Sequence, residues 1–105
     1  MINLKSIGAA AGISLLFAFP ALAADHAVAI QGMKFSPANL TVAVGDTVTF
    51  TNMDSAPHTA TANDGSFDTG RLNRGQSAKI TIKKAGQFAY ICAFHPMMKG
   101  QITAN

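Results

Sequence analysis

Apolar and polar residues alternate through most of the chain after residue 23, and this period of two sets the fold class. It is typical of β-strands that bury one face, because successive side chains point to opposite sides of a strand. The clearest alternating apolar positions are Leu40, Val42 and Val44, then Val48 and Phe50, then Ala78, Ile80 and Ile82. Several strands with one apolar face each are covered when two sheets pack together. The sequence therefore predicts an all-β sandwich.

About seven to eight short strands are expected, because turn residues such as Gly45-Asp46, Asn63-Asp64-Gly65 and Ala85-Gly86 interrupt the alternation. The strands that we predict are Ala27–Phe35, Leu40–Val44, Thr47–Asn52, His58–Ala62, Ala78–Lys83, Gln87–Cys92 and Gly100–Thr103. Helices find little support after residue 23.

Residues 1–23 differ from the rest and are typical of a cleaved secretory signal. Lys5 gives a positive flank, an apolar run extends from Ile7 to Phe19, and Ala21-Leu22-Ala23 offers small residues for cleavage. The alternative is an uncleaved membrane anchor, since the run approaches the ~18 residues of a spanning helix. Pro20 and the alanine-rich end favour cleavage. We predict a signal peptide at 1–23 and one exported domain at 24–105.

Cys92 is the only cysteine of the sequence, so no disulfide can form within the chain. The 82 residues after position 23 bury only a thin core, and small exported domains usually depend on a disulfide or a bound metal. A metal ion held by this thiol is the natural candidate. The other interpretation is a buried structural thiol.

The segment Cys92-Ala93-Phe94-His95-Pro96-Met97-Met98 places a thiol, an imidazole and a thioether at three-residue steps after an expected strand. Soft sulfur combined with imidazole selects copper, and two histidines with one cysteine and a weak axial methionine make a blue-copper site. Met97 competes with Met98 for the axial position, but the spacing favours Met98.

A second imidazole has to come from another part of the chain. His58 follows Asp54-Ser55-Ala56-Pro57, where a loop leads into an expected strand, so it can face the cysteine loop. His26 lies two residues from the expected mature terminus and is less suited to that role. The free terminus Ala24-Asp25-His26 could instead hold a second Cu(II) through four coplanar nitrogens.

These residues resemble the cupredoxin, or type 1 blue-copper, family over nearly the whole expected mature chain. The resemblance also covers Gln31-Gly32-Met33-Lys34-Phe35, Gly45-Asp46-Thr47-Val48 and Ala56-Pro57-His58. The step from His95 to Met98 is similar to the amicyanin branch, whereas plastocyanin-type members have a longer gap. The resemblance implies a cupredoxin-like Greek-key β-sandwich with one type 1 copper, in which His58, Cys92 and His95 are equatorial ligands and Met98 is the axial one.

The chain departs from the amicyanin pattern at two positions. Thr59 stands where several relatives have Asn, so the hydrogen bonds that hold the ligand loop are expected to differ. Phe94 stands where amicyanin has Pro, and it keeps a backbone N–H that can point at the Cys92 sulfur. A hydrogen bond to the thiolate favours the reduced state, so we hypothesise a higher reduction potential than in a proline-bearing relative.

The expected function is electron transfer in the periplasm, with Cu(I)/Cu(II) cycling between a donor and an acceptor protein. Catalysis is not expected, because four protein ligands leave no open position for a substrate. The alternatives are a periplasmic copper chaperone or buffer, which Met53, Met97 and Met98 leave open, and a structural sandwich with incidental His and Met.

Charge and exposed residues bear on the partners of the protein. Without Lys5, seven basic residues face five aspartates, and they lack the clustering typical of nucleic-acid binding. We expect a monomer with no stable membrane insertion after signal cleavage. Phe94, Pro96 and Met97 are either core residues or an exposed apolar rim around His95 where a redox partner docks.

Overall fold

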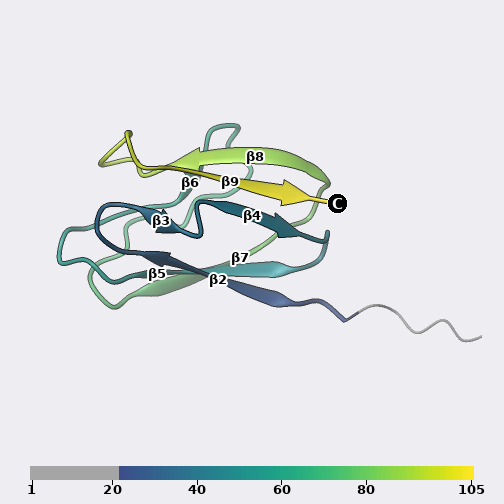
Figure 1. Cartoon of the computed structure of the whole chain (residues 1–105), viewed down its shortest axis with the longest axis horizontal. Coiled ribbons are helices and arrows are strands. Elements are labelled where there is room, and N and C mark those ends of the chain that lie inside the picture. Colours follow the sequence, from purple (N-terminus) through teal and green to yellow (C-terminus); the bar gives the residue numbers. More distant parts are fainter. Residues whose placement is uncertain (1–21) are drawn as a thin grey trace, which may run out of the picture.

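A computed structural model describes residues 22–105, so residues 1–21 of the predicted signal peptide lie outside the described residues. Within this range eight strands form two sheets of four, and no residue is helical. No helix long and apolar enough to cross a membrane occurs in this range. The predicted all-β, Greek-key sandwich is confirmed, and Figure 1 shows its two layers.

The two sheets join strands that are far apart in the sequence. The first has the order β3 (Phe35–Ser36), β2 (Asp25–Ile30), β5 (Thr47–Asn52) and β7 (Ser77–Thr81). The second has the order β4 (Asn39–Val42), β9 (Lys99–Ala104), β8 (Gly86–Ile91) and β6 (Thr61–Ala62). The pairs β2 with β5 and β4 with β9 run parallel, and the other neighbours are antiparallel.

The core lies between the sheets and is built by the alternation seen in the sequence. In β5 the side chains of Val48, Phe50 and Asn52 are buried, while the threonines between them are half-buried. Phe50 and Tyr90 pack edge to face with their ring centroids 5.5 Å apart. Burial of each such aromatic side chain contributes about 1.5–3 kcal/mol. Because Cys92 follows β8 and is fully buried, this core extends to the cysteine loop.

The predicted strand Ala27–Phe35 is wrong as a single element, because the chain turns back after Ile30. Gly32 and Met33 adopt positive φ angles of 64° and 61°, in the left-handed region that interrupts a strand. The two carboxylate oxygens of Asp54 accept hydrogen bonds from these two amides, at 2.8 and 3.0 Å. A period-two pattern carries no signal for a turn that a distant side chain stabilises.

Besides the strand predicted at Ala78–Lys83, which is observed at Ser77–Thr81, two other predicted strands are shorter than expected. The strand at His58–Ala62 is reduced to Thr61–Ala62, because His58 instead forms an isolated bridge with Leu72. The strand at Leu40–Val44 ends at Val42, because the Asp46 amide bonds to the Ala43 carbonyl and closes a turn. The first of these changes places His58 in a loop connection at the end of the sandwich.

Candidate metal centre

The loop between β8 and β9 is held compact by its own backbone. The amide of His95 donates to the carbonyl of Cys92 at 3.2 Å, and the amide of Met98 donates to the carbonyl of His95 at 2.9 Å. The Cys92 amide donates back to the Met98 carbonyl at 3.2 Å. Thiol, imidazole and thioether are therefore presented by a single closed loop, as the three-residue spacing predicted.

Three donor atoms of the predicted site converge. The Sγ atom of Cys92 lies 3.6 Å from Nδ1 of His58 and 3.6 Å from Nδ1 of His95, and all three donors lie within 4.8 Å of one another. A first-row metal ion with bonds of about 2.0 Å to nitrogen and 2.3 Å to sulfur holds two such donors roughly 3.5–3.7 Å apart. The donor set therefore fits one metal ion, and one sulfur with two imidazoles favours copper.

A carboxylate fixes the orientation of His58. The imidazole is fully buried, and its Nε2 atom lies 2.9 Å from Oδ2 of Asp54. The pKa of Asp54 is lowered, first by the Met33 amide, then by the Gly32 amide, and also by the His58 ring, so this carboxylate is an acceptor at neutral pH. When the Nε2 N–H group donates a hydrogen bond to Asp54, Nδ1 carries no proton. Its lone pair, which faces Cys92, is then free to bind a metal ion.

Thr59 connects the two loops that carry the donors. Its amide donates to the Cys92 sulfur at 3.3 Å, and its Oγ1 atom accepts from the Ala93 amide at 2.8 Å. The same hydroxyl shares a 2.8 Å hydrogen bond with Thr61. The hydrogen bond expected from the Phe94 amide to the sulfur is not present in residues 22–105, where the Thr59 amide donates to it instead. The predicted effect of Phe94 on the reduction potential therefore loses the contact that motivated it, and the potential itself stays untested.

Burial separates the two neighbouring methionines. Met98 is 2% exposed, whereas Met97 is 72% exposed, so only Met98 points into the protein beside the cysteine loop. His95 is half-buried, in contrast to the fully buried His58. The site therefore has one imidazole inside the protein and one that reaches the surface.

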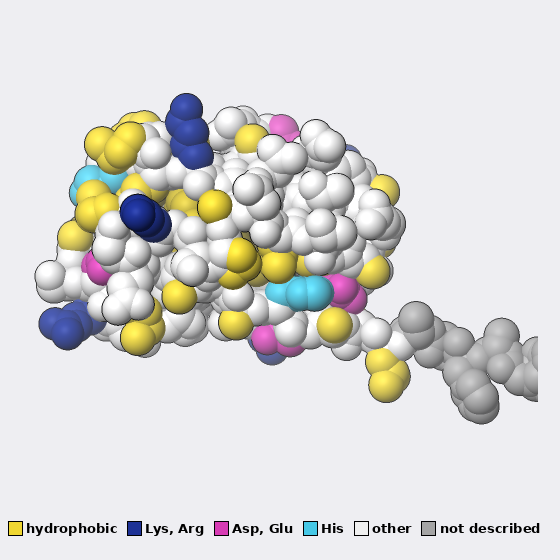
Figure 2. All heavy atoms as spheres, viewed as in Figure 1, with side chains coloured by type: hydrophobic (Ala, Val, Ile, Leu, Met, Phe, Trp, Pro, Cys, Tyr) yellow, Lys and Arg dark blue, Asp and Glu magenta, His cyan; other side chains and the backbone are white. Residues whose placement is uncertain are grey.

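The surface around the loop is apolar. Phe94 and Met97 of this loop are large hydrophobic residues that are 47% and 72% exposed, and Met33 and Met53, which adjoin Asp54 by a hydrogen bond and in the sequence, are 41% and 49% exposed. The guanidinium of Arg71 lies 5.8 Å from the centre of the Phe94 ring, a cation–π distance. Figure 2 shows hydrophobic side chains gathered at the end of the molecule where β8 terminates. Phe94 and Met97 are thus rim residues and not core residues.

The predicted second copper site at Ala24-Asp25-His26 meets an obstacle in the fold. Asp25 and His26 belong to β2 and pair in register with β5. Four coplanar nitrogens need consecutive amides that point together, whereas amides in a strand alternate in direction. In addition, Nε2 of His26 lies 2.9 Å from Oδ2 of Asp46. Binding of Cu(II) there would require the start of β2 to leave the sheet.

Sequence reasoning identified the three residues that converge, His58, Cys92 and His95, but missed Asp54 as the partner of His58. The only signal was a carboxylate four residues before the histidine, a spacing without special meaning in a loop. The importance of Thr59 was expected only as a change in hydrogen bonding, and its contacts depend on the tertiary structure.

The family model described as a cupredoxin-like domain matches residues 7–104. The chain is 30% identical over 89 residues to amicyanin of Paracoccus denitrificans, covering 78% of this chain and 68% of that protein. Its structure is similar to that of a mutant amicyanin in the reduced state, with a TM-score of 0.72 and 31% identity over 77% of this chain and 82% of the other. A purple cupredoxin from Nitrosopumilus maritimus gives a TM-score of 0.70 and 32% identity over 77% of this chain and 100% of the other.

Proposed function

This chain belongs to the cupredoxin family, and we propose that it is a periplasmic type 1 copper protein that moves single electrons between a donor and an acceptor protein. The observation that carries the proposal is the convergence of Cys92 Sγ with Nδ1 of His58 and Nδ1 of His95, where two of the three residues are buried and the third is half-buried. Amicyanin and plastocyanin are among its relatives. We infer that His58, Cys92 and His95 are the equatorial ligands and that Met98 is the axial ligand.

Copper bound by these donors would supply one-electron exchange between Cu(I) and Cu(II). The protein's part is to hold the donors still. Cys92 and His58 are fully buried, Asp54 fixes the His58 ring, and Thr59 joins the two loops. A donor set that is positioned by the fold changes little between the two oxidation states, and a small rearrangement permits fast electron transfer.

His95 is half-buried, whereas His58 and Cys92 are fully buried, so His95 is the donor that connects this site to solvent. Its neighbours Phe94 and Met97 form an exposed apolar surface, which suits transient contact with a partner protein. Four protein ligands leave no position for a substrate, so we do not assign a catalytic activity.

Export is part of the same proposal. A signal peptide at 1–23 would release a domain that starts at Ala24, and a single cysteine bound to metal is protected from disulfide formation in an oxidising compartment. Mass spectrometry of the protein purified from the periplasmic fraction should give an amino terminus at Ala24. Recovery of the uncut chain in the membrane fraction would contradict the proposal.

A copper chaperone or buffer is the second candidate, because the exposed Met97 of the cysteine loop and the exposed Met53 beside Asp54 in the sequence offer soft sulfur at the surface. Addition of Cu(II) followed by cyclic voltammetry separates the two functions. An electron carrier gives an intense visible thiolate-to-copper band and a reversible one-electron wave. A colourless complex that binds Cu(I) but shows no reversible wave would support the chaperone and overturn electron transfer.

A further inference from the structure

The strand β7 leaves one edge of its sheet open. Among residues 22–105 it is the last strand of the first sheet, and its one strand partner there is β5. The Asn52 amide donates a hydrogen bond to the carbonyl of Gln76, and the Ile82 amide donates one to the carbonyl of Asp46. The backbone N–H and C=O groups of the even-numbered residues 76–82 therefore point toward β5. By the alternation of an antiparallel ladder, Ser77, Lys79 and Thr81 direct their backbone N–H and C=O groups to the open edge.

A groove of about 660 Å³ lies along this edge. Its apolar residues come from both layers: Ile80 and Ile82 from β7 and its end, Phe67 from the loop after β6, and Phe88 from β8. Ile80 is half-buried, and the other three are 3–8% exposed. The groove thus has an apolar floor beside a row of free backbone hydrogen-bonding groups.

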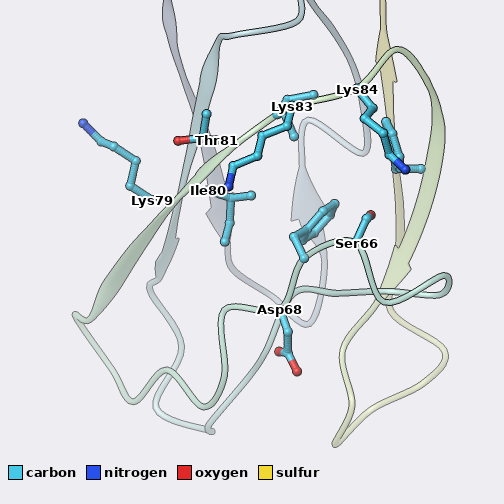
Figure 3. A pocket seen from close by; sticks show the side chains of 10 residues that line it. Ser66, Asp68, Lys79, Ile80, Thr81, Lys83 and Lys84 are labelled. Carbon is cyan, nitrogen blue, oxygen red and sulfur yellow. The ribbon is translucent and has the colours of Figure 1, made fainter.

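The charge around the groove is mainly positive. The residues that line it include Lys79, Lys83 and Lys84 but only one acid, Asp68. Figure 3 shows Lys83 running along the strand toward Ile80, Lys84 on the other side of the groove, and Asp68 at the opposite end. Within residues 22–105 neither Lys83 nor Lys84 forms an ion pair, while Lys79 lies 3.9 Å from Asp25. The Oδ1 atom of Asp68 accepts hydrogen bonds from the Thr61 hydroxyl and the Gly70 amide.

We propose that this groove is a docking surface for an extended acidic segment of a partner protein, which pairs with the free edge of β7 while its carboxylates contact Lys83 and Lys84. Strand addition of this kind obtains its affinity from main-chain hydrogen bonds and its specificity from alternate side chains. Charge complementarity selects the occupant. A second copy of this chain placed edge to edge would bring the lysines of both copies together, which costs free energy.

The test uses the copper-loaded protein in its diamagnetic reduced state, labelled with ¹⁵N. The probe is a blocked peptide of alternating aspartate and valine, which is titrated at low salt while amide shifts are recorded. We expect saturable shifts at residues 77–84 and weakening by added salt. We also expect a roughly fivefold loss of affinity in the double variant Lys83→Gln/Lys84→Gln, as for the loss of two exposed ion pairs.

Three controls make the test decisive. The matched double variant Lys34→Gln/Lys99→Gln removes two exposed lysines outside the groove and should bind like the wild type. A peptide with proline in place of the central valine, and one with lysine in place of aspartate, should not bind. The visible band of each oxidised variant checks that it is folded.

Several outcomes overturn the proposal. These are the absence of binding to the wild type, equal binding of the proline peptide, unchanged affinity in Lys83→Gln/Lys84→Gln, and shifts confined to the apolar surface around His95. If analytical sedimentation showed that the protein dimerises through β7, the occupant of the groove would be a second copy of the chain, and the proposed acidic partner would be wrong. None of these results bears on whether the copper centre carries electrons, which voltammetry decides separately.

Discussion

The Nε2 atom of His58 lies 2.9 Å from Oδ2 of Asp54, and the opposite ring nitrogen of His58 faces the Cys92 sulfur at 3.6 Å. The carboxylate is itself held by the amides of Gly32 and Met33. A turn between the first two described strands is thereby linked, through two hydrogen-bonded side chains, to the centre of the metal site.

Replacement of Asp54 should weaken copper binding. In Asp54→Ala the His58 ring loses the acceptor that fixes its tautomer and orientation, so we expect a 10- to 100-fold loss of copper affinity. The measurement is a competition titration with a chelator. Asp64→Ala is the matched control, since Asp64 is an exposed loop aspartate that accepts only from Ser66 in the described residues. Equal affinity in both variants would show that Asp54 only supports the turn at Gly32.

Removal of the Thr59 hydroxyl should loosen the contact between the two loops. Thr59→Val keeps the shape of the side chain but leaves the Ala93 amide without its acceptor, which costs about 1–3 kcal/mol of unfolding free energy. Denaturant unfolding of the copper-free form measures this loss, and voltammetry should show a changed midpoint potential in the copper form. Thr59→Ser retains the hydroxyl and should restore most of both properties. A Thr59→Val protein that matches the wild type would remove the role given to this hydroxyl.

Acid should weaken the fold partly through Asp46. The backbone nitrogen of Ala24, the His26 ring and the Ala43 amide lower the pKa of this carboxyl from 3.8 to about 2. A lowered folded-state pKa contributes stability that is complete well above pH 3.8 and is lost as the pH falls through about 2. Asp46→Asn should therefore lower the melting temperature of the copper-free protein at pH 7.

The pH dependence identifies this effect as electrostatic. The difference in melting temperature between wild type and Asp46→Asn should be present well above pH 3.8 and shrink as the pH falls toward about 2. The carboxyls of Asp25, Asp54 and Asp64 also have lowered pKa values, but both proteins contain them, so their contribution cancels. If the difference in melting temperature did not change with pH, the loss of stability in Asp46→Asn would be due to packing alone.

The Tyr90 hydroxyl offers a way to stabilise the core. The side chain is 1% exposed, its hydroxyl has no hydrogen-bond partner in the described part of the chain, and burial raises its pKa. Tyr90→Phe should raise the unfolding free energy by about 1 kcal/mol, because it removes an unsatisfied polar group and keeps the ring. Tyr90→Leu should instead lose stability, since the ring packs against Phe35 and Phe50. Marked destabilisation by Tyr90→Phe would indicate a hydrogen-bonded water at this hydroxyl.

The parts of the fold that depend on local pattern were predictable. The period of two located β5, which was predicted at its observed bounds, because its buried positions alternate along one strand. The three-residue steps from Cys92 to Met98 identified the ligand loop, because its backbone hydrogen bonds follow the same spacing. Both features depend on residues that are close together in the sequence.

The parts that depend on distant contacts were not predictable. The turn at Gly32 and Met33 needs a carboxylate that lies 21 or 22 residues further along the chain. The position of His58 depends on a bridge to Leu72, and the groove beside β7 joins residues from two layers. A single sequence carries no periodic signal for pairs of this kind.

The visible spectrum of the copper-loaded protein, recorded for wild type and Cys92→Ser side by side, tests the central claim most directly. The account predicts an intense thiolate-to-copper band in the wild type and its complete loss in Cys92→Ser, with one copper per wild-type chain. An equally intense band in the serine variant, or no such band in either protein, would contradict it.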